Sequence, residues 1–178
     1  MLMKTALLVI DIQQALIDEH PANEELFLKR VDELIQAAHA SGKEVIYVRH
    51  DGGAGDLLEQ GSPGWRLNRS LSPSVQERIF EKRYPSSFKD TGLKDYLLER
   101  GIQRLVICGM QTEYCIDSSV KAAFEHGFSV VIPSGATTTY SNPFLSGEQM
   151  ISYYETMIWQ LPIAEVVSMQ SALEILKS

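Results

Sequence analysis

Short strand-like runs alternate along this chain with segments of helical periodicity, and this alternation most constrains the fold. The runs lie at 7–10, 45–48, 78–81, 105–108, 128–132 and 163–167, and the runs 7–10, 45–48 and 105–108 are apolar at every position. Strands of this kind are buried on both faces, which is typical of a parallel sheet covered by helices. The pattern therefore predicts an α/β fold, a three-layer α/β/α sandwich around a mostly parallel, six-stranded sheet.

Helical segments fill the intervals between these runs. Asn23 is a suitable N-cap and Gly42 a suitable stop for the first long helix. Ser146 and Gln149 have the spacing of a capping box for a helix that reaches about Trp159. The remaining helices are expected from Leu93 to a stop at Gly101, along the apolar face Ile116, Val120, Ala123 and Phe124 to a stop at Gly127, and over 169–176.

The length and charge of the chain limit what it does. Its 178 residues fit one domain, 1–178, because domains run roughly 100–200 residues. The net charge of −7 makes a nucleic acid an unexpected partner. No apolar run reaches the roughly 18 residues that span a bilayer. Met1 to Asp11 is too short for a signal peptide and is interrupted by the aspartate, so we expect a cytoplasmic protein without a membrane partner.

Three residues whose side chains could take part in catalysis lie at the ends of strands of the predicted sheet or just after them. Asp11 ends the first strand, Lys82 ends the third, and Cys115 follows the fourth, where 109–113 turn the chain into a helix. Sites in such sheets form at the carboxyl ends of the strands. The irregular stretches 51–74 and 133–146 lie at the same edge, where they could wall a pocket.

An acid, a cation and a thiol together resemble an activated nucleophile. With Thr112 as N-cap, Cys115 lies in a first helical turn, where the helix and Lys82 are expected to lower the pKa of the thiol. Asp11 would accept the thiol proton. Each residue also has an ordinary explanation: a turn-capping aspartate, a solvated lysine, a small buried cysteine. Cys108, inside an apolar run, is expected in the core.

Three segments of the chain, in order, resemble the isochorismatase-like cysteine hydrolases, a superfamily that includes nicotinamidases and carbamoylsarcosine amidase. Segment 8–13 is similar to the family's opening strand, with an acid and then a glutamine. Segment 81–88 is similar to its lysine segment, and 105–119 to its nucleophile segment. The resemblance covers nearly the whole chain and implies a Rossmann-like, six-stranded parallel sheet.

The resemblance also implies roles for single residues. Asp11, Lys82 and Cys115 would form the catalytic triad. A cis peptide is expected at Met110–Gln111, and the backbone N–H groups of Gln111 and Cys115 would form the oxyanion hole. For the substrate-binding residues we expect Gln13, Trp65 and Tyr114.

The chain departs from the nicotinamidases, which carry an Asp-x-His motif and a further histidine that together bind a metal. Here the corresponding place reads His50, Asp51, Gly52 and Gly53. A metal site needs several ligands at fixed geometry. We therefore expect no metal and no other cofactor, and interpret His50 as a residue of the pocket rim or a hydrogen-bonded residue.

The predicted function is hydrolysis of a small amide through a thioester on the cysteine. One alternative is an isochorismatase-type vinyl-ether hydrolase, which relies on acid catalysis and requires no thiol. A nucleotide-binding domain is a weaker alternative, because no G-x-G-x-x-G follows the first strand. The intact triad disfavours a scaffold without activity.

The helix before Trp159 carries more apolar positions than one narrow stripe, which predicts a homo-oligomer, a dimer or tetramer. Related family members also commonly assemble. The positions are Met150, Ile151, Tyr153, Tyr154, Met157 and Ile158.

Overall fold

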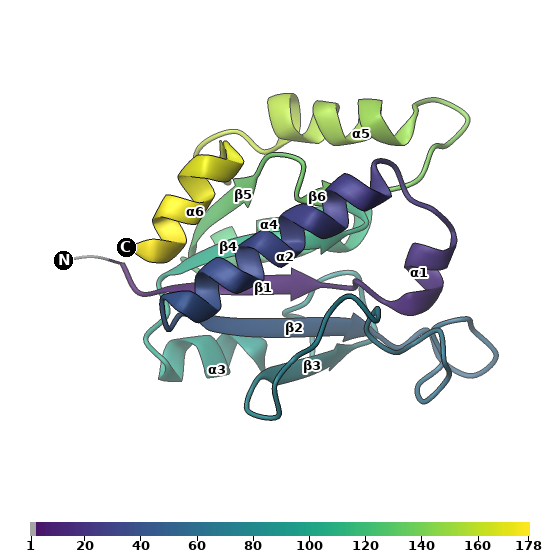
Figure 1. The fold of residues 1–178 in the computed structure, drawn as a ribbon, viewed down its shortest axis with the longest axis horizontal. Coiled ribbons are helices and arrows are strands. Elements are labelled where there is room, and N and C mark those ends of the chain that lie inside the picture. The colour runs from purple at the N-terminus through teal and green to yellow at the C-terminus, as the bar shows by residue number, and fades with distance from the viewer. Residues whose placement is uncertain (1–2) are drawn as a thin grey trace.

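The computed structural model describes residues 3–178 and confirms the predicted α/β fold (Figure 1). Six strands follow the order β3-β2-β1-β4-β5-β7, and each neighbouring pair is parallel. A seventh strand, β6, pairs with β4. The strands are β1 Thr5–Ile10, β2 Glu44–His50, β3 Arg78–Lys82, β4 Arg104–Met110, β5 Ser129–Pro133, β6 Thr137–Thr138 and β7 Glu165–Val167.

Helices cover both faces of the sheet. In Figure 1, α2 and α6 lie across one face, and α3 and α4 lie behind the other. The helices are α1 Gln14–Asp18, α2 Glu24–Ala40, α3 Leu93–Glu99, α4 Asp117–Glu125, α5 Gly147–Tyr153 and α6 Met169–Lys177, with π-helical turns η1 Thr112–Ile116 and η2 Tyr154–Ile158. Within residues 3–178, no helix has the length and apolar character needed to cross a membrane.

The central strand β1 shows why the apolar runs form a covered sheet. All six of its residues are buried. Because side chains alternate between the faces of a strand, Leu8 and Ile10 join the core on the side of α3 and α4. Leu7 and Val9 join the core under α2 and α6. Because both faces of the strand are buried, Ala6 to Ile10 are apolar at every position, as the sequence indicated.

The order of the strands creates a crevice at one end of the sheet. From β1 the chain moves to β2 on one side, whereas β4 pairs on the other side, so the carboxyl ends of β1 and β4 flank a switch point. Gly109 allows the two ends to approach. Its φ is +134°, and a Cβ at this position would lie 2.0 Å from the carbonyl oxygen of Ile10.

Several local predictions need correction. Asn23 precedes α2, but it is in a left-handed conformation and its side chain makes no capping hydrogen bond. Phe124, predicted on the buried face of α4, is 39% exposed. The two short elements α1 and β6 were not predicted. The capping box of Ser146 and Gln149 is confirmed, although the helix that it starts continues as η2 after Tyr153.

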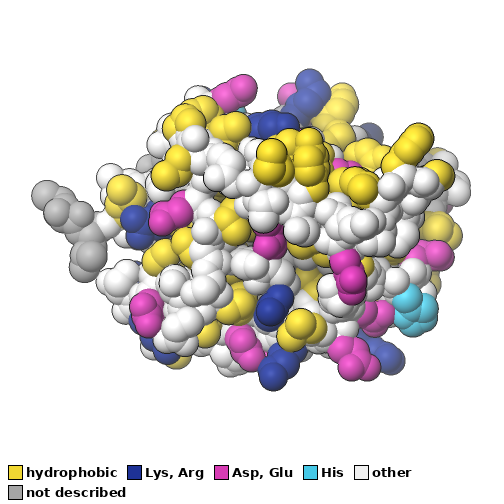
Figure 2. Space-filling view, turned by 90° about the horizontal axis from the view of Figure 1, so that it is seen from above, with side chains coloured by type: hydrophobic (Ala, Val, Ile, Leu, Met, Phe, Trp, Pro, Cys, Tyr) yellow, Lys and Arg dark blue, Asp and Glu magenta, His cyan; other side chains and the backbone are white. Residues whose placement is uncertain are grey.

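Apolar side chains are exposed on and beside α5 and η2. Figure 2 looks down on this side of the molecule and shows hydrophobic side chains gathered there. The large exposed ones in this part of the chain include Phe144, Tyr153, Met157 and Leu161.

Candidate active site

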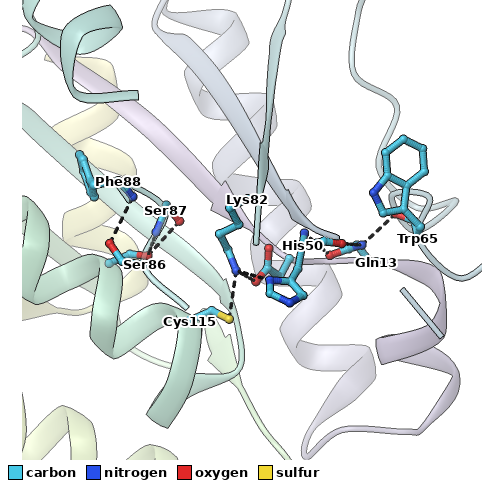
Figure 3. A network of polar contacts seen from close by, with 10 residues as sticks. Gln13, His50, Trp65, Lys82, Ser86, Ser87, Phe88 and Cys115 are labelled. Carbon is cyan, nitrogen blue, oxygen red and sulfur yellow. Dashed lines mark hydrogen bonds and ion pairs between the residues drawn. The ribbon is translucent and has the colours of Figure 1, made fainter. Parts of the chain in front are cut away.

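The three residues selected from the sequence meet at the carboxyl edge of the sheet, and Figure 3 labels Lys82 and Cys115. The Nζ atom of Lys82 lies 2.6 Å from Oδ2 of Asp11 and 3.2 Å from Sγ of Cys115. Lys82 ends β3, Asp11 follows β1, and Cys115 lies in η1 after β4. The topology therefore brings an acid, a cation and a thiol from three separate segments into contact.

Lys82 has a third partner at the same nitrogen. Its Nζ lies 3.2 Å from Nδ1 of His50, the last residue of β2. His50 pairs with Lys82 in the parallel register of β2 and β3. The Lys82 ammonium therefore forms an ion pair with the Asp11 carboxylate and lies within hydrogen-bond distance of the thiol and the imidazole.

The backbone of Asp11 is fixed by a hydrogen bond, whereas its side-chain carboxylate is free to accept a proton. Its φ is 54°, a left-handed conformation that aspartate tolerates better than most residues. Its N–H donates to the carbonyl oxygen of Val48 at 2.9 Å. The side chain is buried, and neither carboxylate oxygen accepts a regular hydrogen bond from the described residues. The positive charge of Lys82 balances the negative charge of this carboxylate. The oxygens of Asp11 keep the capacity to accept a proton.

The turn after β4 carries Cys115, the expected nucleophile. The peptide bond Met110–Gln111 is cis, as the resemblance implied. The carbonyl oxygen of Gln111 accepts from the N–H groups of Tyr114 and Ile116, both at 3.1 Å. The predicted oxyanion hole consists of two other N–H groups, those of Gln111 and Cys115. Neither of them donates to the Gln111 carbonyl oxygen in these two bonds.

Thr112 does not cap this turn, so that prediction is wrong. The turn makes no side-chain cap, and the Thr112 hydroxyl donates to Oγ1 of Thr137 at 3.1 Å. Glu113 accepts from the Thr139 hydroxyl at 2.9 Å. Both contacts attach the turn that carries Cys115 to the segment at β6. This short strand therefore helps to hold the turn in position.

A second attachment joins the lysine segment to the helix that follows the nucleophile. Ser119 Oγ accepts from the N–H of Ser87 at 2.9 Å and donates to Ser87 Oγ at 2.8 Å. Both serines are fully buried. Ser87 follows β3 and Ser119 lies in α4, so this pair fixes the distance between the segments of Lys82 and Cys115 (Figure 3).

The thiol of Cys115 is not ionised at rest, contrary to the expectation that Lys82 and the helix would lower its pKa. The pKa of Cys115 is raised to about 12, mainly by burial; the Asp11 carboxylate also raises this pKa, by more than Lys82 lowers it. Burial also raises the pKa of Cys108, which is fully enclosed in the core as predicted. A neutral thiol beside a carboxylate needs that carboxylate as a base before it can attack.

A pocket of about 260 Å³ opens onto Asp11 and Cys115. Asp11 and Cys115 form its reactive end, and Tyr114, predicted to bind substrate, lies in its wall and is 58% exposed. Most of the wall is apolar. The lining residues are Asp11, Leu16, His50, Leu58, Pro85, Met110, Gln111, Tyr114 and Cys115.

The structure places Gln13 and Trp65 outside this lining. Gln13 is fully buried, and its amide bonds the backbone of His50 in both directions, at 2.9 and 2.7 Å, and the carbonyl oxygen of Trp65 at 2.9 Å. Trp65 stacks on the guanidinium of Arg49, 3.4 Å from the ring centroid. Both residues support the loop that follows β2. Leu58, the apolar residue that this loop does place in the pocket, was not selected from the sequence.

His50 and Asp51 have different positions. His50 lines the pocket, and burial followed by the Lys82 charge lowers the pKa of its imidazole. Asp51 instead accepts from the N–H groups of Gly53 and Gln60 and from Arg83. Over residues 3–178, histidine, cysteine, aspartate and glutamate side chains form no group of three or more that could hold a metal ion.

The chain belongs to the isochorismatase family of hydrolases. Residues 5–158 match the family model described as the isochorismatase domain. The solved structure of an isochorismatase from Pseudomonas putida KT2440 has a TM-score of 0.88 and 25% sequence identity, over 94% of this chain and 89% of that one.

Two relatives of this chain are named as hydrolases. A streptothricin hydrolase from Streptomyces noursei is 33% identical over 144 residues, 80% of this chain and 57% of the relative. The chain thus spans little more than half the length of that relative. The ureidoacrylate amidohydrolase RutB of Acinetobacter baylyi is 28% identical over 159 residues, 68% of this chain and 65% of the relative.

Proposed function

We propose that this protein is a cysteine hydrolase that cleaves the C–N bond of a small amide through a thioester on Cys115. One observation carries the proposal: the Lys82 ammonium contacts both Asp11 and Cys115 at the end of a small, mostly apolar pocket. The name of the relative RutB, an amidohydrolase, supports the same bond type.

In the first half of the reaction, Asp11 accepts the Cys115 proton as the sulfur attacks the carbonyl carbon. The new C–S bond leaves negative charge on the carbonyl oxygen, and the N–H groups of Gln111 and Cys115 would donate to that oxygen. When the C–N bond breaks, protonated Asp11 gives its proton to the leaving nitrogen. The products of this half are an amine or ammonia and a thioester.

In the second half, Asp11 takes a proton from water as the water oxygen attacks the thioester. The C–S bond then breaks, and Asp11 returns the proton to sulfur. Lys82 stays charged throughout and keeps the carboxylate and the transient thiolate in place. Asp11 is suited to this alternation because its oxygens accept no other regular hydrogen bond from the described chain.

Acid quench of the enzyme with a panel of small primary amides tests the proposal. Intact-mass and peptide measurements should find an acyl group on Cys115 that forms and decays while ammonia is released. Cys115→Ala should abolish both signals. Cys108→Ala is the matched control, because Cys108 is enclosed in β4 away from the pocket lining. Ammonia release by Cys115→Ala at a rate near that of the wild type would overturn the thioester route on Cys115.

A further inference from the structure

His50 is a polar side chain of the pocket wall that the proposed reaction does not use. It lies in the lining together with Leu58 and Pro85, and its imidazole stands beside the Lys82 ammonium (Figure 3). Its backbone is fixed on both sides, because its N–H donates to Gln13 and its carbonyl oxygen accepts from the same amide. The imidazole therefore has a defined position at the pocket.

The contact with Lys82 decides which imidazole nitrogen carries the proton. Lys82 has only N–H donors, so Nδ1 of His50 accepts at this contact. A neutral imidazole that accepts at Nδ1 carries its hydrogen on Nε2. The imidazole is kept neutral, because burial and the Lys82 charge both lower its pKa. Lys82 thus sets His50 as a donor through Nε2.

That donor has no partner in the part of the chain that the structure describes. No hydrogen bond joins Nε2 to residues 3–178, and Nε2 is not among the enclosed polar atoms without partners. It is therefore open to a molecule in the pocket. The thiol and the imidazole both lie 3.2 Å from the same lysine nitrogen, so a small molecule acylating Cys115 lies within reach of His50.

The charges of the pocket restrict what such a molecule carries. Of the described residues that line it, Asp11 is the charged one, and Lys82 already neutralises it. The remaining wall is largely apolar. A charged group on the substrate would lose its water without gaining a counter-charge, which is costly. An uncharged acceptor oxygen would instead gain the Nε2 hydrogen bond.

We infer that His50 selects the substrate: the protein prefers uncharged small amides whose acyl group carries a hydrogen-bond acceptor, which receives the Nε2–H of His50. This inference rests on the proposed amide hydrolysis and names the substrate class for it. His50 acts on specificity, whereas Asp11 and Cys115 carry out the reaction.

Three amides of similar length test the inference: 3-methoxypropanamide, pentanamide and succinamate. The first two differ by one ether oxygen in place of a methylene, and the third ends in a carboxylate. Ammonia release gives kcat/KM for each. The wild type should prefer the methoxy compound to pentanamide by about 3- to 10-fold, the worth of one neutral hydrogen bond, and should use succinamate least.

Two variants separate the two roles of the His50 side chain, which donates to the substrate through Nε2 and accepts from Lys82 at Nδ1. The side-chain amide of His50→Asn reaches the position of Nδ1 and can still accept from Lys82, but it has no group at Nε2. The longer His50→Gln restores an N–H near Nε2. The methoxy-to-pentanamide ratio should fall to about one in His50→Asn and recover in His50→Gln. A purely structural role would lower both rates together and leave the ratio unchanged.

The outcomes are distinguishable from failure of the proposed function. An equal ratio in the wild type and His50→Asn, with ammonia still released and Cys115 still acylated, overturns the inference alone. A preference for succinamate overturns it as well, because that preference requires a free cation. Absence of both ammonia and an acyl group on Cys115 with every amide overturns the proposed function and this inference with it.

Discussion

The Nζ atom of Lys82 lies 2.6 Å from Oδ2 of Asp11, and the two side chains are 0% and 1% exposed. Two charges removed from water in this way stabilise each other only as a pair. Neither Asp11 oxygen has a regular hydrogen bond from the described residues, so the lysine is the main compensation for the buried carboxylate. The same two residues therefore contribute both to the free energy of unfolding and to the proposed reaction.

Loss of one partner should destabilise the protein more than loss of both. In Lys82→Met the Asp11 carboxylate is buried without a counter-charge, and the free energy of unfolding should fall by about 3–5 kcal/mol. Asp11→Asn combined with Lys82→Met removes both charges and should recover part of that loss. Urea unfolding of the two variants measures the difference. Equal destabilisation in both would contradict the prediction that removing the second charge recovers stability.

The double variant should recover stability but not activity. Its folded state lacks both the base and the cation that the proposed reaction uses. Amide turnover measured on the same preparations therefore separates folding from catalysis. Turnover near the wild-type rate in the double variant would contradict the roles given to both residues.

Asp11→Asn alone should fold at room temperature and lose turnover by about 10²- to 10⁴-fold, the usual contribution of a general base. Asparagine has nearly the same shape and tolerates the left-handed φ of 54° at this position, but it cannot accept and return a proton. Circular dichroism checks the fold, and ammonia release checks the rate. A variant that keeps most of its rate would make Asp11 a structural residue.

Activity should not depend on an added metal. The polar groups nearest the place of the nicotinamidase-type motif are already engaged: Nδ1 of His50 with Lys82, and Asp51 with Gly53, Gln60 and Arg83. Dialysis against a strong chelator should leave the rate unchanged. A large loss that zinc or another divalent ion restores would mean that these residues rearrange to bind a metal.

The meeting of Asp11, Lys82 and Cys115 could be predicted from the sequence, because the rule that selects these residues is topological. Asp11, Lys82 and Cys115 each follow a strand, and parallel strands end at one edge. No knowledge of side-chain contacts was needed. The same holds for Cys108, whose burial follows from its apolar run.

The rest of the site depends on contacts that no local pattern contains. The sequence predicts Gln13 as a substrate-binding residue. Its side-chain amide instead makes hydrogen bonds to the backbone of His50 and Trp65. Thr112 has the side chain of an N-cap, but its hydroxyl bonds Thr137, 25 residues away. Leu58 reaches the pocket from an irregular loop without any periodicity to signal it.

The pKa of Cys115 shows the same limit. Its position after a strand and near a lysine suggested a lowered pKa, but the balance is set by burial and by the distances to two opposite charges. Those quantities exist only in the folded chain.

The protein should assemble into a homo-oligomer through the side that carries α5 and η2. Tyr153 and Met157 are 48% and 64% exposed there, although both are large and apolar (Figure 2). Light scattering at micromolar concentration should give a mass above the 19.9 kDa of one chain. Met157→Lys should shift the mass toward one chain, whereas Lys177→Met, on α6, should not. A single-chain mass for the wild type would contradict the prediction.

The two cysteines are mutual controls for the environment of the nucleophile. Cys115 should alkylate faster than Cys108 in the folded protein, because Cys115 lines the pocket whereas Cys108 is fully buried and its pKa is also raised by burial. Peptide mapping after limited iodoacetamide treatment measures both. Equal labelling, or label mainly on Cys108, would show that Cys115 is not the accessible thiol.

The pH dependence of this labelling follows from the sign of the shift. With the pKa of Cys115 at about 12, the thiol is neutral at pH 7, and only the thiolate reacts. The thiolate fraction, and with it the alkylation rate, should rise about tenfold per pH unit from pH 7 to 9. Lys82 lowers this pKa, so Lys82→Met should raise it and slow alkylation at every pH in that range, while leaving Cys108 unlabelled. A rate that is already maximal at pH 7 would mean that Cys115 rests as a thiolate, and Asp11 would then not be needed to deprotonate it.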